Sequence, residues 1–325
     1  MTRRPSQRPI LTVTLNPAVD LAAHAEKVVP GGKLRLTAPA TDPGGGGINV
    51  ARAVHRLGGE AAAFVALAGA MGAQLDWLVR AEGVPLIAFE GPGETRHSLS
   101  VIAEDTGLEY RFVLPGADWD MARSEAALAA ILEAVVPEAV VVLSGSQPPG
   151  VPDDFPSRLA RALARQGTGT MLIVDTSGAA LDRLIDIPDA EAPPMILRMD
   201  DAEAEATAGR ALPAPEDTAD YARALVARGV AQTVVVARGA NGSVLVGPGG
   251  RLHCIPPKVE VASTVGAGDS FTGALTLALA RDESAEAALR AGTAAAAAAV
   301  TTPGTELCQR ADVERLLPGC RIVAL

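Results

Sequence analysis

Segments that read as strands alternate with segments that read as helices over most of this chain, and the alternation is most regular beyond residue 117. There, each helix-like segment is followed by a short apolar run. The pattern predicts Ala122–Val135 with Ala139–Leu143, Asp153–Gln166 with Thr170–Val174, and Ala179–Ile185 with Met195–Met199. Strands joined through helices in this way form one mainly parallel sheet that is covered on both faces. We therefore expect a three-layer α/β/α fold.

The remaining segments continue this pattern without an internal repeat or a clear linker, so we expect a single domain over residues 1–325. Further strands are predicted at Ile10–Leu15, Ala61–Leu67, Val84–Phe89 and Thr233–Ala237, with a hairpin made by Gly242–Val246 and Arg251–Ile255. Further helices are predicted at Ile48–Leu57, Asp76–Glu82, 201–208, 216–228, 270–281, 284–300 and 311–317.

One β-hairpin interrupts the alternation. Its strands, Thr95–Ala103 and Leu108–Leu114, flank a turn at 104–107, and it looks like a lid or an edge sheet. The extended residues 20–36 could pair with it, so we expect a small β-sheet lid formed by about 20–36 and 95–114. Within this lid Lys33 and Arg35 alternate with leucines, which is the spacing of two cations on one face of a strand.

Composition restricts the partners and the compartment. The net charge of −10 argues against nucleic acid as a partner. The three cysteines are far apart, which fits reduced thiols in the cytoplasm and no zinc site. The run Ile10–Leu15 is too short for a signal peptide, and no run reaches the roughly 18–20 apolar residues of a membrane span. We expect a soluble cytoplasmic protein with a frayed arm at residues 1–9.

The stretch from Ser263 to Gly273 is the best candidate for the chemistry. Gly266 and Gly268 allow a sharp turn, so the amides of 266–268 would point outward at the start of a helix, where an anion such as a transferring phosphoryl group is stabilised. Asp269 could accept a proton from an attacking hydroxyl at the same place. The alternative is that Asp269 serves only as a helix cap.

A second glycine cluster, Gly44–Gly47, also precedes a predicted helix and is followed by Ile48 and Asn49. Two glycine-lined helix starts in one α/β chain suggest that two ligands meet, for instance a nucleotide and a phosphorylated substrate. Asp20 lies beyond the first predicted strand. It is either a turn residue or a carboxylate that holds sugar hydroxyls, since ligands bind at the carboxyl ends of parallel strands.

Four stretches resemble a known family, the ribokinase-like sugar kinases of the phosphofructokinase B branch, over about residues 10–318. They are 32–35 with 43–52, then 110–116, 144–150 and 263–270. The last matches the C-terminal signature of the family. The four consecutive glycines resemble the minor bacterial 6-phosphofructokinases, whereas Asn16-Pro17 resembles 1-phosphofructokinases and tagatose-6-phosphate kinases.

The resemblance implies ATP-dependent phosphorylation of a sugar phosphate, with fructose 6-phosphate giving fructose 1,6-bisphosphate as the first choice. Tagatose 6-phosphate and fructose 1-phosphate remain alternatives, and so do an unphosphorylated sugar and a nucleoside. A non-catalytic sugar-phosphate binding protein is the rival from another class. In this family the lid sheet commonly makes a dimer interface, so a homodimer through the lid is implied.

The resemblance also assigns roles to residues. Asp269 would be the catalytic base, and the amides of Gly266, Ala267 and Gly268 would stabilise the moving phosphoryl group. Sugar-binding positions would be Asp20, Gly45, Gly46, Asn49 and Ser146. Residues tied to the phosphate of the substrate or to subunit contacts would be Lys33, Arg35 and Arg96.

For ATP, the family pattern implies a site lined by Ala237, Arg238, Gly239, Ala240, Asn241 and Gly242, with Thr293 and Ala297 near the adenine. Magnesium would arrive with ATP. A monovalent cation, potassium in the family pattern, would be bound largely by carbonyls near Ser263, Val265, Ala299 and Gly304.

One motif departs from the family. Relatives carry Lys-Pro-Asn-x-x-Glu near ATP and magnesium, and this chain reads Arg198-Met199-Asp200-Asp201-Ala202-Glu203. The guanidinium of arginine is planar and forked, whereas the ammonium of lysine acts as a point charge, so Arg198 is not equivalent to the family lysine at a phosphate. Asp200 either coordinates magnesium together with Glu203 or weakens ATP binding.

Overall fold

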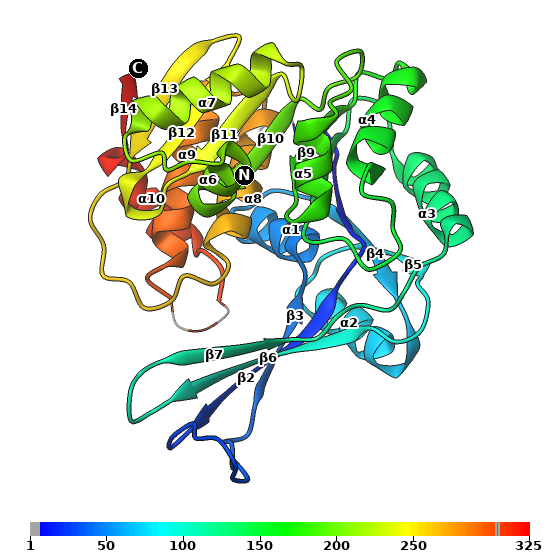
Figure 1. Cartoon of the computed structure of the whole chain (residues 1–325), viewed down its shortest axis with the longest axis vertical. Helices are drawn as coiled ribbons and strands as arrows, with labels where there is room; N and C mark the ends of the chain where they lie inside the picture. The colour runs from blue at the N-terminus through cyan, green and yellow to red at the C-terminus, as the bar shows by residue number, and fades with distance from the viewer. Residues whose placement is uncertain (1–6, 303, 305) are drawn as a thin grey trace, which may run out of the picture.

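The structure is a computed structural model that describes residues 7–302, 304 and 306–325, and a ten-stranded sheet forms its middle layer (Figure 1). The strand order is β14-β13-β12-β11-β10-β9-β8-β1-β4-β5. The seven strands from β11 to β5 are parallel, and β12 to β14 add an antiparallel edge. The strands are β1 Ile10–Thr14, β4 Ala62–Leu67, β5 Leu86–Glu90, β8 Val140–Ser144, β9 Met171–Asp175, β10 Ile196–Asp200, β11 Thr233–Ala237, β12 Ser243–Gly247, β13 Gly250–Ile255 and β14 Arg321–Ala324.

Helices cover both faces of this sheet. One face carries α1 Gly46–Arg56, α2 Gly69–Ala81, α8 Ala267–Ala280, α9 Ala285–Ala299 and α10 Arg310–Leu316. The other carries α3 Met121–Ala134, α4 Phe155–Gln166, α5 Ala179–Asp186, α6 Asp201–Ala208 and α7 Pro215–Ala227. Neighbouring residues of a strand point to opposite cores, as Val140 and Val141 do in β8, because side chains alternate across a sheet. The predicted three-layer α/β/α fold is confirmed.

A second, four-stranded sheet stands away from this body in the order β3-β2-β6-β7 (Figure 1). Its strands are β2 Ala18–Ala25, β3 Ala40–Gly44, β6 Arg96–Ala103 and β7 Glu109–Val113. The predicted hairpin is present as β6 and β7. We call these four strands with their connecting loops the small sheet.

The prediction that Lys33 and Arg35 share a strand face is wrong. Residues 26–39 form a mostly exposed loop whose single bridge joins Ala25 to Leu36, and β2 pairs instead with β3. The alternation of charged residues with leucines favours a strand, but it does not provide a neighbouring strand to pair with. Strand β3 was not predicted because Pro43 interrupts its pattern, and proline is tolerated at the edge of a sheet, where β3 lies.

Other boundaries differ from the prediction at the ends of elements. Helix α2 begins at Gly69 instead of Asp76, and α8 begins at Ala267 instead of residue 270. Strand β14 was missed because it is short and mostly exposed, so it has little apolar pattern. Of the arm expected at 1–9, residues 1–6 lie outside the described part, whereas the amide of Arg8 donates to Ala280 O at 2.7 Å. No helix among the described residues is long and apolar enough to cross a membrane.

The order of the strands places a crevice beside β1. After β1 the chain builds β4 and β5 on one side, and it then returns to pair β8 with the other side of β1. Loops that leave two such strands diverge, and ligands of open α/β sheets bind in the crevice between them. The residues that follow β1 and β8 therefore mark the place where a site is expected.

Candidate active site

Asp269 lies in the first turn of α8 at this crevice. The helix is capped by Gly266 without any side-chain cap, so the interpretation of Asp269 as only a cap is wrong. Its Oδ2 instead accepts a hydrogen bond from Asn49 Nδ2 at 2.9 Å. The residue helps to line a cavity of about 130 Å³, together with Ser144, Gly145, Asp175, Thr176, Ser177, Arg198 and Glu203.

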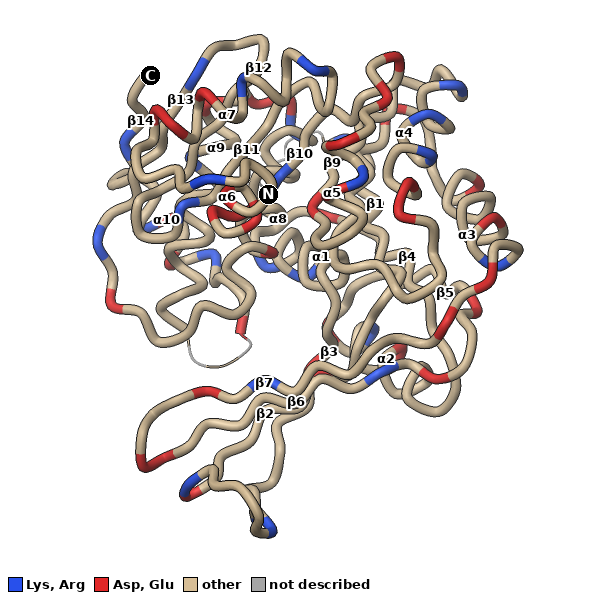
Figure 2. Tube along the Cα trace, viewed as in Figure 1, with Lys and Arg blue, Asp and Glu red and all other residues tan. Residues whose placement is uncertain are grey.

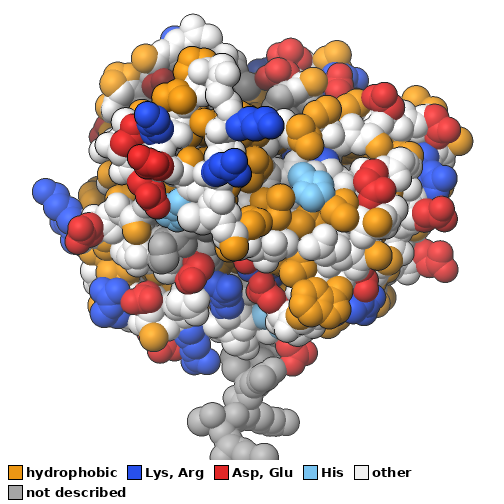
Figure 3. All heavy atoms as spheres, turned by 90° about the horizontal axis from the view of Figure 1, so that it is seen from below, with side chains coloured by type: hydrophobic (Ala, Val, Ile, Leu, Met, Phe, Trp, Pro, Cys, Tyr) orange, Lys and Arg blue, Asp and Glu red, His pale blue; other side chains and the backbone are white. Residues whose placement is uncertain are grey.

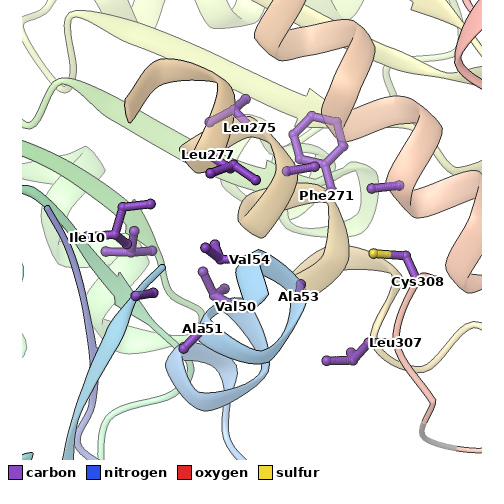
Figure 4. Close-up of a cluster of buried hydrophobic side chains, with 14 of the residues drawn as sticks. Ile10, Val50, Ala51, Ala53, Val54, Phe271, Leu275, Leu277, Leu307 and Cys308 are labelled. Atoms are coloured by element: carbon purple, nitrogen blue, oxygen red, sulfur yellow. The ribbon is translucent and has the colours of Figure 1, made fainter. Parts of the chain in front are cut away.

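Close packing of α1 against α8 brings Asn49 to Asp269. Figure 4 shows the apolar side chains between the two helices, among them Val50, Val54 and Leu277. The helices touch at Gly273, where an added Cβ would lie only 2.7 Å from the Cβ of Ala53. A residue without a side chain is therefore required there if the two helices are to keep this separation.

The surroundings of the Asp269 carboxyl raise its pKa to about 6. Burial is the largest cause, because it disfavours the charged form, and the carboxylates of Asp175 and Asp20 act in the same direction. The hydrogen bond from Asn49 and the charge of Arg198 lower the pKa and oppose them. A carboxyl with this pKa is ionised at neutral pH and still accepts a proton readily, as a general base must.

Arg198 lies in the middle of β10, and its side chain reaches the start of α8. Its Nη1 donates to Asp175 Oδ1 at 3.2 Å, and the other oxygen of Asp175 accepts from the Thr272 hydroxyl at 2.7 Å. A Cβ at position 268 would lie 2.9 Å from Arg198 Nη2, so glycine at 268 makes room for the guanidinium. Within the described residues Arg198 Nε is buried without a hydrogen-bond partner. The guanidinium is thus held by one edge.

Each of the two acids expected to hold magnesium, Asp200 and Glu203, accepts a hydrogen bond from the backbone amide of the other. Asp200 Oδ1 accepts from the amide of Glu203 at 2.8 Å, and Glu203 Oε2 accepts from the amide of Asp200 at 2.9 Å. This reciprocal capping box begins α6 and occupies one oxygen of each carboxylate. Glu203 lines the cavity, and burial raises its pKa. In the described part of the chain no three metal-ligating side chains cluster, so a metal would need ligands from a bound molecule or from water.

Arg96 and Ser146 both contact Asn16, which follows β1 at the crevice, and Asp20 interacts with the charge of Arg96. Asn16 Nδ2 donates to Ser146 Oγ at 3.2 Å, and Arg96 Nη2 donates to Asn16 O at 3.2 Å. Burial raises the pKa of Asp20 to about 6, while Arg96, Arg111 and Arg52 oppose the shift and Asp42 adds to it. Of the predicted sugar residues, Gly45 lies against Pro17, since an added Cβ would be 3.3 Å from its Cα, and Gly46 lies against Ser144 and Gly145.

The structure does not bring every predicted residue to the crevice. Lys33 and Arg35 lie in the exposed loop at the free end of the small sheet (Figure 2). The buried side chain of Arg238 turns into the body, where it donates to Leu212 O at 2.8 Å, to Pro213 O at 2.8 Å and to the Thr218 hydroxyl. Only the backbone of Arg238 is therefore available to a nucleotide.

The segments assigned to ATP and to potassium lie around the start of α8 and along α9. Ala237 ends β11, the turn 239–241 follows as a short 3₁₀ helix that ends at Gly242, and Thr293 and Ala297 are buried on α9. The Ser263 hydroxyl donates to Gly304 O at 2.8 Å and accepts from the amide of Val265 at 3.2 Å. Ala299 O accepts from the Thr302 hydroxyl at 2.7 Å. The two segments predicted to hold potassium therefore meet, as a site made of carbonyls requires.

Sequence reasoning missed several polar residues at the site. Asp175 had a usable signal, because it is a carboxylate at the end of a predicted parallel strand. Thr272 had no such signal, since it is one threonine within an apolar helix. Arg52 and Glu82 were missed because their 2.5 Å ion pair joins segments 30 residues apart.

Comparisons with known proteins find a matching family and several similar proteins. Residues 13–312 match the model of the pfkB family carbohydrate kinases. The chain is 40% identical over 307 residues to the ATP-dependent 6-phosphofructokinase isozyme 2 of Escherichia coli, which covers 94% of this chain and 97% of that protein. It is 34% identical to a 1-phosphofructokinase of Xanthomonas campestris, over 84% of each chain. The crystal structure of phosphofructokinase-2 from Escherichia coli in complex with potassium is similar with a TM-score of 0.88 and 39% identity, over 96% of this chain and 99% of that one.

Proposed function

Because this chain belongs to the pfkB family of carbohydrate kinases, we propose that it transfers the γ-phosphoryl group of ATP to fructose 6-phosphate and forms fructose 1,6-bisphosphate. The observation that carries the proposal is the half-buried Asp269, which lies at the start of α8 with Arg198 on one side and Asn49 on the other. A carboxylate that faces a cationic fork and a row of helix-start amides suits transfer to a hydroxyl group.

In this reaction Asp269 accepts the proton of the attacking hydroxyl as the new oxygen–phosphorus bond forms. The bond between the γ-phosphorus and its bridging oxygen breaks, and ADP leaves with the electron pair. Amides of Gly266, Ala267 and Gly268 stabilise the oxygens of the moving group, and Arg198 adds a fixed positive charge beside them. Such preorganised donors contribute most of the catalysis when little covalent chemistry is needed.

The site offers different kinds of oxygen ligand to the two implied cations, magnesium and potassium. Glu203 and Asp200 offer hard carboxylate oxygens, each with one oxygen outside the capping box, so they would hold magnesium together with the phosphates. Magnesium when bound neutralises charge on those phosphates. Carbonyls near Ser263, Val265, Ala299 and Gly304 would hold potassium next to the first turn of α8.

Arg96 is assigned to the phosphate of the sugar. Replacing Arg96 with alanine is expected to raise the KM for fructose 6-phosphate by about ten- to a hundredfold, because hydrogen bonds to a charged group are worth about 1.5–3 kcal/mol. The KM for ATP should change much less. Steady-state kinetics with each substrate varied in turn measure both values. Arg123→Ala, which removes a surface arginine bonded to Glu90 O, is the control, and equal changes in both KM values would contradict the assignment.

Activity is expected to fall below about pH 6. Asp269 must be ionised to accept a proton, and its pKa of about 6 leaves only about one tenth of the enzyme in that form at pH 5. The kcat/KM for the sugar phosphate, measured from pH 5 to 8, should therefore drop toward acid. The pKa of Asp20 is also about 6, so Asp20→Asn serves as the comparison. Its kcat/KM should still fall toward acid pH, because Asp269 is unchanged. A rate that stays flat to pH 5 would contradict the role of Asp269.

A panel of acceptors tests the function itself. ADP release is measured with fructose 6-phosphate, fructose 1-phosphate, tagatose 6-phosphate and fructose, and the highest kcat/KM is expected for fructose 6-phosphate. The second candidate, phosphorylation of one of the other two sugar phosphates, is favoured by Asn16-Pro17 and by the Xanthomonas relative. Binding without ADP release from any acceptor would instead indicate the non-catalytic sugar-phosphate binding protein.

A homodimer through the small sheet is part of the proposal. Leu108, Phe112 and Val113 are 50–59% exposed there, and Figure 3 looks onto this end of the molecule, where hydrophobic side chains reach the surface. Apolar surface of this kind favours association. The molecular mass in solution, which should be that of two chains, tests this proposal.

Cys254, Cys308 and Cys320 are all free, which supports a cytoplasmic location.

A further inference from the structure

We infer that Arg52 is a positioning residue for phosphoryl transfer, because it fixes the side-chain amide of Asn49 and so keeps the N–H of that amide directed at Asp269. The inference rests on the proposed function and adds to it a residue that does not itself reach the reacting groups.

Arg52 lies on α1 one turn after Asn49, and its side chain is only 3% exposed. Its Nη1 donates to Asn49 Oδ1 at 2.9 Å and to Pro43 O at 3.2 Å. Its Nε and Nη2 donate to the two oxygens of Glu82 at 2.8 Å and 2.5 Å. A buried guanidinium with this many partners has one position, so it is a rigid reference point for Asn49.

The two neighbours of Asn49 require the same orientation of its amide. A carboxylate only accepts hydrogen bonds, so Asp269 is stabilised only when the NH₂ group of Asn49 faces it. A guanidinium only donates, so Arg52 is satisfied only when the Oδ1 atom of Asn49 faces it. Rotation of the amide by half a turn would break both hydrogen bonds and direct an oxygen at the carboxylate.

Glu82 and Pro43 anchor the guanidinium from two other elements. Glu82 caps the C-terminus of α2, and it compensates the buried charge of Arg52. Pro43 lies in β3, so Arg52 also bonds the small sheet. Arg56 lies one turn further along α1 and approaches the same Glu82 at 3.8 Å, but its Nη1 donates to Leu307 O. Arg56 therefore offers a matched control for the charge and the helix.

Loss of Arg52 should raise the pKa of Asp269 through Asn49. The charge of Arg52 also lowers the pKa of Asp20, so its loss there would leave Asp20 less charged and would oppose this rise. The charged groups that face Asp269 are Asp175 from β9, Arg198 from β10 and Asp20 from β2, and none of them bonds to Arg52. With Asn49 free to rotate, its hydrogen bond no longer favours the ionised form of Asp269. The acid limb of the activity should then move to higher pH.

The experiment compares Arg52→Met with Arg56→Met, each in the wild-type background and with Asn49→Ala. Arg52→Met should lower kcat at least tenfold and shift the acid limb upward, whereas Arg56→Met should do neither. When Asn49 is already alanine, Arg52→Met should cost less than about threefold, because residues in one hydrogen-bond network are not additive. An equal loss in both backgrounds, or an unmoved acid limb, would overturn the inference.

Two further measurements cover the other outcomes. If Arg52→Met does not fold, Glu82→Gln keeps the arginine with a weaker partner and should shift the acid limb in the same direction by less. An unshifted limb there would also overturn the inference. A carbon NMR titration of the Asp269 carboxyl, assigned by its loss in Asp269→Asn, needs no turnover. It should show a higher pKa in Arg52→Met even if the wild-type chain phosphorylates none of the tested sugars, which separates this inference from the proposed function.

Discussion

Asp269→Asn is expected to lower kcat by about 10²- to 10⁴-fold, which is the range that a positioned general base contributes. The amide has the same shape as the carboxylate, but it cannot take the proton of the attacking hydroxyl. Binding of the sugar phosphate should remain within a few-fold of wild type, because Asp20, Ser146 and Arg96 are untouched. A coupled ADP assay together with calorimetric titration of the sugar measures both quantities.

The stability of this variant gives an internal check. The folded-state pKa of Asp269 is raised above its ordinary value, so its contribution to stability is present at low pH and is lost as the pH rises through about 6. Removing the charge should therefore leave Tm at pH 7 unchanged or higher. Glu283→Gln, an exposed acid just beyond the other end of α8, is the control for both measurements. Near-normal turnover of Asp269→Asn would remove this residue from the mechanism.

Arg198→Met is expected to lower kcat/KM for ATP by about 10²- to 10³-fold, as the loss of a preorganised donor at a developing charge does. The guanidinium lies over Gly268, and only its Nη1 is bonded to Asp175. Its Nη2 group has no hydrogen-bond partner among the described residues and lies beside Gly268, where it is available to a phosphate oxygen. Steady-state kinetics with ATP varied at a saturating concentration of the sugar phosphate measure the loss.

Two comparison variants separate this role from structural damage. Arg198→Lys restores the residue of the family motif and keeps the charge, but it loses the planar fork, so an intermediate value is expected. Arg198→Met combined with Asp175→Asn removes the carboxylate that would otherwise stay buried without its partner. If this pair of changes restored full activity with ATP, Arg198 would serve only to neutralise Asp175.

The layers and the position of Asp269 at the start of α8 could be predicted because their signals are local. The alternation of helix and strand, and the glycines beside Asp269, lie within short windows of sequence. Arg238 shows the limit of such windows, because its contacts at Leu212, Pro213 and Thr218 depend on how α7 packs. The loop of Lys33 and Arg35 shows another, since its charged alternation suits a strand, but a single bridge from Leu36 to Ala25 joins it to β2.

The network around Asn49 could not be predicted for the same reason. It joins four elements, α1, α2, α8 and β3, and the amide orientation depends on the distance between helices that Gly273 permits. The substitution of Arg198 for lysine was visible in the sequence, but its support by Asp175 and Thr272 was not.

The small sheet and the first turn of α1 are joined by a very short piece of chain, since β3 ends at Gly44 and the helix begins at Gly46. A shift of that sheet would be transmitted through Gly45 to the turn that carries Asn49. Under the proposed function, this connection would couple the position of the sheet over a bound sugar to the hydrogen bond that Asn49 donates to Asp269. Such a coupling would limit the hydrolysis of ATP when no sugar is bound, because water alone would not hold the sheet where Asn49 orients the carboxylate of Asp269.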